Sequence, residues 1–521
     1  MSSSQPALLE RPTLDHVTEP AALPAGPDGS LVRLVVCVAL YAIPAVTALQ
    51  PISEFDTWWH LRTGRWIVEH GALPATDPFT NFGHGKPWVA YSWLFGLLLY
   101  GLHQALGLRG IVLYRAVLAL AVVAAIQRLV SRRGAGFALG AALVAAAAVA
   151  LTPLLVSERP GLFTILFVAL TLDAVFSLRE GTATRAVWLL PLCYALWANI
   201  HIQVVHGLFV LGLACAAPLA DRILGSGRRT PNADTWGSPG WWKLVALSAA
   251  CFLATLVNPY HVGIYSVVVE YGRQTETYQL FPELRAMDFR ELSDWVVLGL
   301  TGAAAYALGR RSRQSAFDLL LAAAAVYFSF HAKHDLWFVV LAACAVIAGS
   351  FHPSPKRQQG EDNNPCWRFG LVGRPIAVTA VALIIAVTAW KRDLSEVGLQ
   401  SAVADEFPVR AAAVIEERGY AGPVYNPIDW GGYLIWRLPE LPAAIDGRTN
   451  LHGDRRIKRF AETWDGQPGW DADPDLAAAR LVVLQQRAPL AALLRLDPRY
   501  TVVYEDALAV VFVRTEPAEG E

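Results

Sequence analysis

The densest group of chemically active side chains lies in residues 55–62, which read FDTWWHLR. Asp56 and His60 are four residues apart, so on a helix both point to the same side. Asp77 follows in the same loop, directly before Pro78. A positioned carboxylate of this kind can act as a general base. Two plainer roles stay open: Asp56 as a helix N-cap and Asp77 as a turn residue.

Acidic and basic residues recur in later segments. Glu158 and Arg159 stand together and either pair with each other or serve a substrate. Residues 197–201 (WANIH) and 331–335 (HAKHD) add further groups, which in a plainer interpretation are a helix end and a solvated turn. The candidate acids are Asp56, Glu158 and Asp77, and Asp56 with Glu158 would hold a divalent cation if one is required. The candidate substrate-binding residues are His60, Arg159, Asn199, His201, His331, Lys333 and His334.

The composition indicates which kind of protein must position these residues. Of 521 residues, 54% are apolar and 17% are charged, and the mean hydropathy is +0.36. Soluble proteins carry about a quarter charged residues. The values therefore favour a polytopic membrane protein with a soluble part. The net charge of −1 argues against a nucleic-acid-binding protein.

Apolar runs predict about eleven membrane spans. The first follows a Ser-, Pro- and Ala-rich stretch, residues 1–30, which we expect to be disordered and cytoplasmic. The run at 91–106 is ambiguous. If it lies along the membrane interface, the Arg and Lys residues of later loops collect on the cytoplasmic side, and if it spans, this agreement is lost. We therefore expect an interfacial helix there. The spans are predicted at 31–49, 110–130, 135–155, 161–178, 186–202, 205–220, 241–257, 293–309, 316–331, 335–350 and 375–390.

This topology places the unusual polar segments on the external face of a membrane domain at 31–390. They comprise a long first loop at about 50–109, the segments near residues 158, 199 and 260, and the segments 262–291 and 331–335. Polar helix ends explain single residues. They do not explain repeated Asn, His and Glu residues at the same membrane face.

Residues 391–521 predict a small external α/β domain. We expect Gly431 and Gly432 to form a tight turn or a close backbone approach. Asp446 and Arg448 are two residues apart at a predicted strand end, where they either bind a ligand or form an internal salt bridge. Strands are expected at 423–425, 443–445, 481–484, 501–504 and 508–513, and helices at 405–418, 455–463, 474–479 and 490–494.

Carboxylates and cations at an outer membrane face suit transfer of a sugar from a polyprenyl phosphate, a donor that partitions into the bilayer. Such a transfer needs a base for the acceptor hydroxyl. It also needs cations for the phosphate leaving group and stabilisation of an oxocarbenium-like sugar. Asp56 fits the base, and Arg159, Lys333, His331 or a divalent cation fits the phosphate. The sequence has no HExxH, CxxC or phosphate-loop motif.

Several motifs resemble those of bacterial integral membrane glycosyltransferases of the GT-C superfamily, and more narrowly those of Rgt-type lipopolysaccharide glycosyltransferase-like proteins. The first, D-x-W-W-H-L-x-x-G, is also similar to the first-loop aspartate motif of oligosaccharyltransferase catalytic subunits. The resemblance covers residues 50–460. The motifs lie at 56–64, 74–79 (P-x-T-D-P-F), 86–88 (K-P-W), 158–163 (E-R-P-x-L-F), 197–201 (W-A-N-x-H), 258–260 (N-P-Y), 431–438 (G-G-Y-L-I-W-x-L) and 446–448 (D-G-R).

The resemblance implies a mainly helical GT-C fold with a large first external loop, interfacial helices and a donor cavity between spans. It implies a first-loop aspartate as base, which carries over to Asp56, and by loop order a second acid at Glu158. Residues 200–203 (IHIQ) and Lys333 depart from the group's usual pattern. The implied protein lies in the bacterial plasma membrane, its C-terminal domain periplasmic. It transfers a sugar from a polyprenyl-phosphate donor to an envelope glycan, lipid or protein.

A non-catalytic polytopic membrane protein stays as the alternative, either a transporter or an envelope assembly factor with an external binding domain. A transporter would place charges at mid-membrane and often has inverted repeats. Asp173 and Asp318 are the candidate charges, but both fall near the predicted cytoplasmic halves of their spans, and no repeat is visible.

Overall fold

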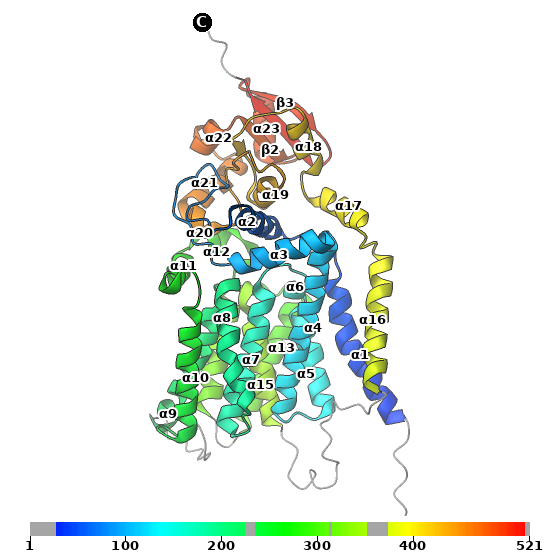
Figure 1. The fold of residues 1–521 in the computed structure, drawn as a ribbon, viewed down its shortest axis with the longest axis vertical. Coiled ribbons are helices and arrows are strands. Elements are labelled where there is room, and N and C mark those ends of the chain that lie inside the picture. Colours follow the sequence, from blue (N-terminus) through cyan, green and yellow to red (C-terminus); the bar gives the residue numbers. More distant parts are fainter. Residues whose placement is uncertain (1–27, 224–234, 312–314, 352–372, 516–521) are drawn as a thin grey trace, which may run out of the picture.

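The computed structural model describes residues 28–223, 235–311, 315–351 and 373–515. It consists mainly of helices, which stand side by side in a bundle with a small mixed domain at one end (Figure 1). In the described part of the chain, seven helical segments are long and apolar enough to span a membrane. They are α1 (Asp28–Ala48), α4 (Leu108–Arg132), α7 (Gly161–Glu180), α9 (Val204–Ile223), α13 (Leu292–Gly309), η4 with α15 (Lys333–Ser350) and α16 (Gly373–Lys391).

The other predicted spans coincide with shorter helices. A helix of 11 residues, such as α8, is only about 17 Å long, against a hydrocarbon core of about 30 Å. The number of eleven therefore stays a prediction. Residues 1–27, which make up most of the predicted cytoplasmic tail, lie outside the described part of the chain. Residues 224–234 and 352–372, which carry several of the predicted cytoplasmic cations, also lie outside it. The shorter helices are α5 (Phe137–Ala150), α8 (Leu190–Ile200), α10 (Pro239–Thr255) and α14 (Ala316–His331).

At the end of the bundle away from the mixed domain, acids of α7 and α14 pair with arginines. Asp173 lies 3.0 Å from Arg128 Nε and 2.8 Å from Arg132 Nη1. Asp318 lies 2.5 Å from Arg311 Nη1. Each carboxylate thus pairs with an arginine at or near the end of a neighbouring helix, which gives no support to a transporter with charges at mid-membrane.

Helices α2 (Asp56–His70) and α3 (Trp93–Leu106) lie across the end of the bundle, beneath the mixed domain (Figure 1). They cross at Gly64 and Gly96, where a methyl group at position 64 would lie 2.1 Å from the Gly96 carbonyl oxygen. This orientation of α3 agrees with the expected interfacial helix. Helix α2 therefore packs directly against α3.

The mixed domain contains one four-stranded sheet in the order β1-β2-β4-β3. β1 pairs in parallel with β2, and the other two pairings are antiparallel. Leu484, Val510 and Phe512 are fully buried in the core of the sheet. The strands are β1 (Val424–Tyr425), β2 (Leu481–Gln485), β3 (Tyr500–Glu505) and β4 (Ala509–Arg514), and the helices include α17 (Glu396–Glu406), α18 (Val409–Glu417), α19 (Ile428–Arg437), α20 (Thr449–His452), α21 (Asp454–Trp464), α22 (Pro474–Ala478) and α23 (Pro489–Leu496).

Three expectations for this domain need correction. Residues 443–445 form no strand, because Ala443 has only isolated bridges, one of them to Thr80 of the first loop. The predicted helix at 405–418 is two helices, which separate around Pro408, a residue that lacks a backbone N–H. Gly431 and Gly432 lie inside α19 and form no turn, although both make the expected close approach.

The segments predicted to be external and the mixed domain form one layer over one end of the bundle (Figure 1). Between α10 and α13, the chain forms α11 (Ile264–Gly272) and α12 (Glu276–Leu280). The Asp454 carboxylate accepts hydrogen bonds from the backbone N–H groups of Glu276 (3.0 Å) and Thr277 (3.2 Å). Asp454 therefore caps α12 and ties this segment to the C-terminal domain.

We predict that this layer faces the outside of the cell. Cysteines at the exposed positions His84 and Gln467 should react with a membrane-impermeant maleimide in intact cells, whereas a cysteine at exposed Thr235 should not. Thr235→Cys should become reactive after permeabilisation, and the parent chain sets the background. Labelling only at Thr235 in intact cells would show that the topology is the opposite of the one predicted.

Candidate active site

Asp56 is the first residue of α2, as its position in the sequence predicts. The helix N-cap is Phe55 and has no side-chain capping bond, so the structure does not show Asp56 as an N-cap. One carboxylate oxygen, Oδ1, accepts a hydrogen bond of 2.8 Å from Trp59 Nε1. The other, Oδ2, lies 3.3 Å from Arg159 Nε. The carboxylate is thus held between its own helix and the segment that precedes α7.

Arg159 contacts three carboxylates from two distant parts of the chain. Its Nη2 lies 2.8 Å from Glu54 Oε1, its Nε faces Asp56, and its Nη1 donates to Glu283. The guanidinium also lies 5.2 Å from the centre of the Phe55 ring. The E-R-P motif therefore places a cation next to the first-loop aspartate.

The surroundings raise the pKa values of both Asp56 and Arg159. Burial raises the pKa of Asp56 to about 7, Arg159 opposes the shift, and the neighbouring Glu54 adds to it. Burial works against the charge of Arg159, but the nearby carboxylates Glu54, Asp56 and Glu283 outweigh it and hold its pKa well above the usual value. Near neutral pH, Asp56 can therefore exchange a proton while Arg159 stays charged.

Glu158 does not pair with the adjacent Arg159 but with another arginine. It is fully buried and pairs with Arg115 of α4. Arg115 also donates to the carbonyl oxygens of Ala48 (2.6 Å) and Val156 (2.8 Å). Burial raises the pKa of Glu158 to about 7, and Arg115 opposes the shift. Glu158 thus stabilises the joint between the end of α1 and the segment that carries Arg159, and its catalytic role stays a prediction.

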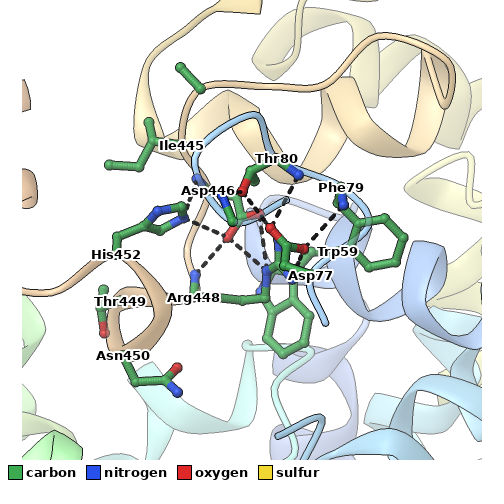
Figure 2. Close-up of polar contacts among 12 residues, drawn as sticks. Trp59, Asp77, Phe79, Thr80, Ile445, Asp446, Arg448, Thr449, Asn450 and His452 are labelled. Carbon is green, nitrogen blue, oxygen red and sulfur yellow. Dashed lines mark hydrogen bonds and ion pairs between the residues drawn. The ribbon is translucent and has the colours of Figure 1, made fainter. Parts of the chain in front are cut away.

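Asp77 is buried in a turn of the first loop. Its carboxylate accepts hydrogen bonds from the backbone N–H groups of Phe79 (3.1 Å) and Thr80 (3.2 Å). It also accepts a 2.8 Å bond from Arg448 Nη1 in the C-terminal domain (Figure 2). These contacts favour the turn role of Asp77 and add a bridge between the loop and the domain.

The predicted salt bridge between Asp446 and Arg448 is present and fully buried. Arg448 Nε lies 3.0 Å from both oxygens of Asp446, and His452 Nε2 lies 3.4 Å from one of them (Figure 2). Burial would raise the pKa of Asp446, but Arg448 and His452 outweigh it and hold the pKa below its usual range. Arg448 therefore joins two buried carboxylates, Asp446 and Asp77.

Three other predicted residues pack within the protein. His60 is buried, its ring 4.6 Å from that of Phe95; burial lowers its pKa, and it forms no hydrogen bond with Asp56. Asn199 accepts a 2.9 Å bond from Trp93 Nε1, which fastens α3 to α8. His201 Nδ1 lies 2.8 Å from a threonine hydroxyl of α7.

The segment 331–335 divides between exposed and paired groups. His331 is exposed and stacks on Tyr327, with ring centres 5.8 Å apart. Lys333 Nζ lies 3.2 Å from Asp294. His334 Nδ1 lies 3.5 Å from an oxygen of Asp335. Lys333 and His334 line the same cavity as Arg159.

A cavity of about 570 Å³ lies next to Arg159. Apolar side chains of α7 and α15, including Leu162, Ile165 and Trp337, line one part of it. Its volume is in the range of small-molecule sites. Asp56 contacts Arg159 but is not itself a lining residue, and the other predicted residues that do not line the cavity are His60, Asp77, Glu158, Asn199, His201 and His331. The charged and histidine residues that do are Glu54, Arg159, Glu283, Arg285, Asp288, Arg290, Glu291, Lys333 and His334.

The arrangement of donors does not fit the divalent cation considered for Asp56 and Glu158. Glu158 faces Arg115, and the guanidinium of Arg159 occupies the space between the carboxylates of Asp56 and Glu283. Among the described residues, no group of three His, Cys, Asp or Glu side chains is arranged to hold a metal ion.

Comparisons with known proteins give a likeness in fold alone. No protein-family model matches the chain, and no curated protein matches it. The chain is similar to ArnT from Cupriavidus metallidurans, solved bound to undecaprenyl phosphate, at 13% identity and a TM-score of 0.47 over 95% of this chain and 100% of ArnT. It is similar to the arabinofuranosyltransferase AftD from Mycobacteria at 15% identity and a TM-score of 0.46 over 93% of this chain.

The chain spans 40% of the length of AftD. Both proteins are GT-C membrane glycosyltransferases. At this identity and TM-score the likeness describes the general arrangement of the chain and assigns no activity to it. The narrower resemblance to Rgt-type proteins stays a prediction.

Sequence patterns alone do not single out several residues of the site. Glu54 lies before the recognisable motif, and Glu283, Arg285 and Arg290 lie in a segment without one. The available signal was the placement of residues 262–291 on the same membrane face as Arg159. That placement puts residues 262–291 and Arg159 on the same side of the membrane, but it does not predict which side chain of the segment contacts Arg159.

We predict that Arg448→Met lowers the free energy of unfolding by about 3–5 kcal/mol, because it leaves two buried carboxylates without their cation. Arg499→Met is the matched control, since Arg499 binds Asp497 with the same two-residue spacing at the surface; exposed pairs of this kind contribute about 1 kcal/mol or less. Thermal unfolding of both variants in detergent measures the difference. Equal losses would mean that the buried position of Arg448 is unimportant.

Proposed function

We propose that the protein transfers a sugar from a polyprenyl-phosphate donor to a hydroxyl of an envelope glycan, lipid or protein at the external face of the plasma membrane. One observation supports this above the others. The Asp56 carboxylate contacts Arg159 beside a cavity that has an apolar part between helices and a charged part under the external layer. A donor with a prenyl chain and a phosphate needs both parts.

Asp56 supplies the base in this reaction. Its carboxylate takes the proton of the acceptor hydroxyl as that oxygen forms a bond to the anomeric carbon. The bond between the anomeric carbon and the phosphate oxygen breaks, and the phosphate leaves with the electron pair. Asp56 then holds the proton, which passes to solvent when product leaves.

The cationic side chains serve the leaving group. Arg285, Arg290 and Lys333 line the charged part of the cavity, where they can stabilise the negative charge that develops on the phosphate. Arg159 has a different part, because three carboxylates already surround it. It favours the ionised form of Asp56 against the effect of burial and holds the carboxylate in place.

We predict that Asp56→Asn lowers the rate of transfer by about 10²–10⁴-fold, the usual effect of losing a general base. Asparagine keeps the size of the side chain and can still accept the bond from Trp59, so membrane insertion and melting temperature should stay near normal. The readout is the surface glycan of a deletion strain that carries the variant, with Asp77→Asn as a comparison. A normal glycan with Asp56→Asn would remove this residue from the mechanism.

We predict that activity falls as pH drops through about 7, because only the ionised carboxylate accepts a proton and burial raises the pKa of Asp56 to that value. Below the pKa the rate should fall about tenfold per pH unit. The pKa of Glu158 is raised to a similar value, so Glu158→Gln serves as the control and should keep the acid limb. If the fall of activity at acid pH disappeared in Glu158→Gln, the group that titrates would be Glu158 and not Asp56.

A further inference from the structure

Gly447 of the C-terminal domain lies directly against the Asp56 carboxylate. A methyl group at position 447 would lie 2.0 Å from Asp56 Oδ1 and 3.0 Å from Phe55 Cε2. The φ angle of Gly447 is not in the left-handed region, so the backbone itself accepts other residues. Space against Asp56, and not backbone conformation, therefore requires glycine here.

The turn that carries Gly447 is fixed on both sides. On one side is the buried contact of Arg448 with Asp446 and Asp77 (Figure 2). On the other, the Thr449 carbonyl oxygen accepts a 2.8 Å bond from Gln274 Nε2. Because both flanks are anchored to external segments of the membrane domain, the turn cannot withdraw from Asp56 without breaking buried polar contacts.

The oxygen that Gly447 covers is the one that binds Trp59. Oδ1 accepts the indole N–H, and Oδ2 faces Arg159. The carboxylate is therefore enclosed by three segments: its own helix, the segment before α7, and the C-terminal turn. Moving Oδ1 would break its bond to Trp59 and shift Oδ2 relative to Arg159.

We propose that Gly447 is a positioning residue for Asp56, so that the C-terminal domain completes the transfer site and is not a separate binding module. This rests on the proposed function, in which Asp56 is the base. The domain acts through contact: its docked turn leaves Asp56 one position, with Oδ1 on Trp59 and Oδ2 on Arg159. Displacement of a catalytic group by about 1 Å can lower a rate about 10²-fold.

A double-mutant cycle on stability tests the contact without an activity assay. Gly447→Ala should lower the melting temperature of the full chain in detergent, or prevent folding, because its methyl group meets the carboxylate. In the Asp56→Ala background the carboxylate is absent, so the same substitution should have little effect and a non-folding Gly447→Ala chain should be rescued. An equal loss in both backgrounds would overturn the proposal.

The second measurement separates positioning from a general loss of structure. Gly447→Ala should lower turnover by about 10²-fold while the affinity for undecaprenyl phosphate, used as the binding probe, stays unchanged. In the Asp56→Asn background it should cause no further loss of turnover. Gly272→Ala is the matched control, since a methyl group there meets no atom within 4 Å.

The two proposals fail in different ways. A normal glycan with Asp56→Asn would overturn the function proposed for Asp56. Loss of the glycan with Asp56→Asn together with normal turnover of Gly447→Ala would overturn only the positioning role. Weaker binding of undecaprenyl phosphate by Gly447→Ala would also contradict it, because the effect would then lie in the donor site.

Discussion

The guanidinium of Arg159 contacts Glu54, Asp56 and Glu283, and the arrangement of the layer over the bundle depends on this contact. An arginine stays charged in a protein, so a buried one must be given acidic partners. Here the partners come from the start of the first loop and from the segment after α12. Meeting that requirement brings the two segments together next to the cavity and holds the Asp56 carboxylate against Arg159, which lines it.

The same solution recurs at two other joints. Arg115 connects the end of α1, the segment after α6 and Glu158. Arg448 connects the C-terminal domain to the first loop through Asp446 and Asp77. Loops bury little apolar surface, so buried ion pairs of this kind specify their positions more than they add to stability. Three arginines thus fix the loops of a layer into which the hydrophobic core of the bundle continues, through Trp58 of α2 and Val483 of the C-terminal sheet.

The proposed function rests on the contact between this layer and the bundle. The bundle supplies apolar walls from α7 and α15, and the layer supplies charged groups, one of which, Arg159, contacts the candidate base Asp56. Neither part alone suits an amphipathic donor. The turn at Gly447 adds the C-terminal domain to the arrangement, since it lies against the same carboxylate that Arg159 holds. The C-terminal domain, which the sequence predicts to be separate, is therefore in contact with the candidate site.

The sequence by itself determined the elements that local rules govern. Long apolar runs predicted the helices, Arg and Lys bias predicted α3 across the bundle end, and spacing placed Asp56 at the start of α2. Only the tertiary structure decided which charges meet. The pairing of Arg159 with Glu283 joins residues 124 positions apart, and that of Arg448 with Asp77 joins residues 371 positions apart. No local pattern encodes such contacts, because burial and packing of whole segments select them. For that reason adjacent Glu158 and Arg159 took different partners, and Gly447 acquired its place beside Asp56.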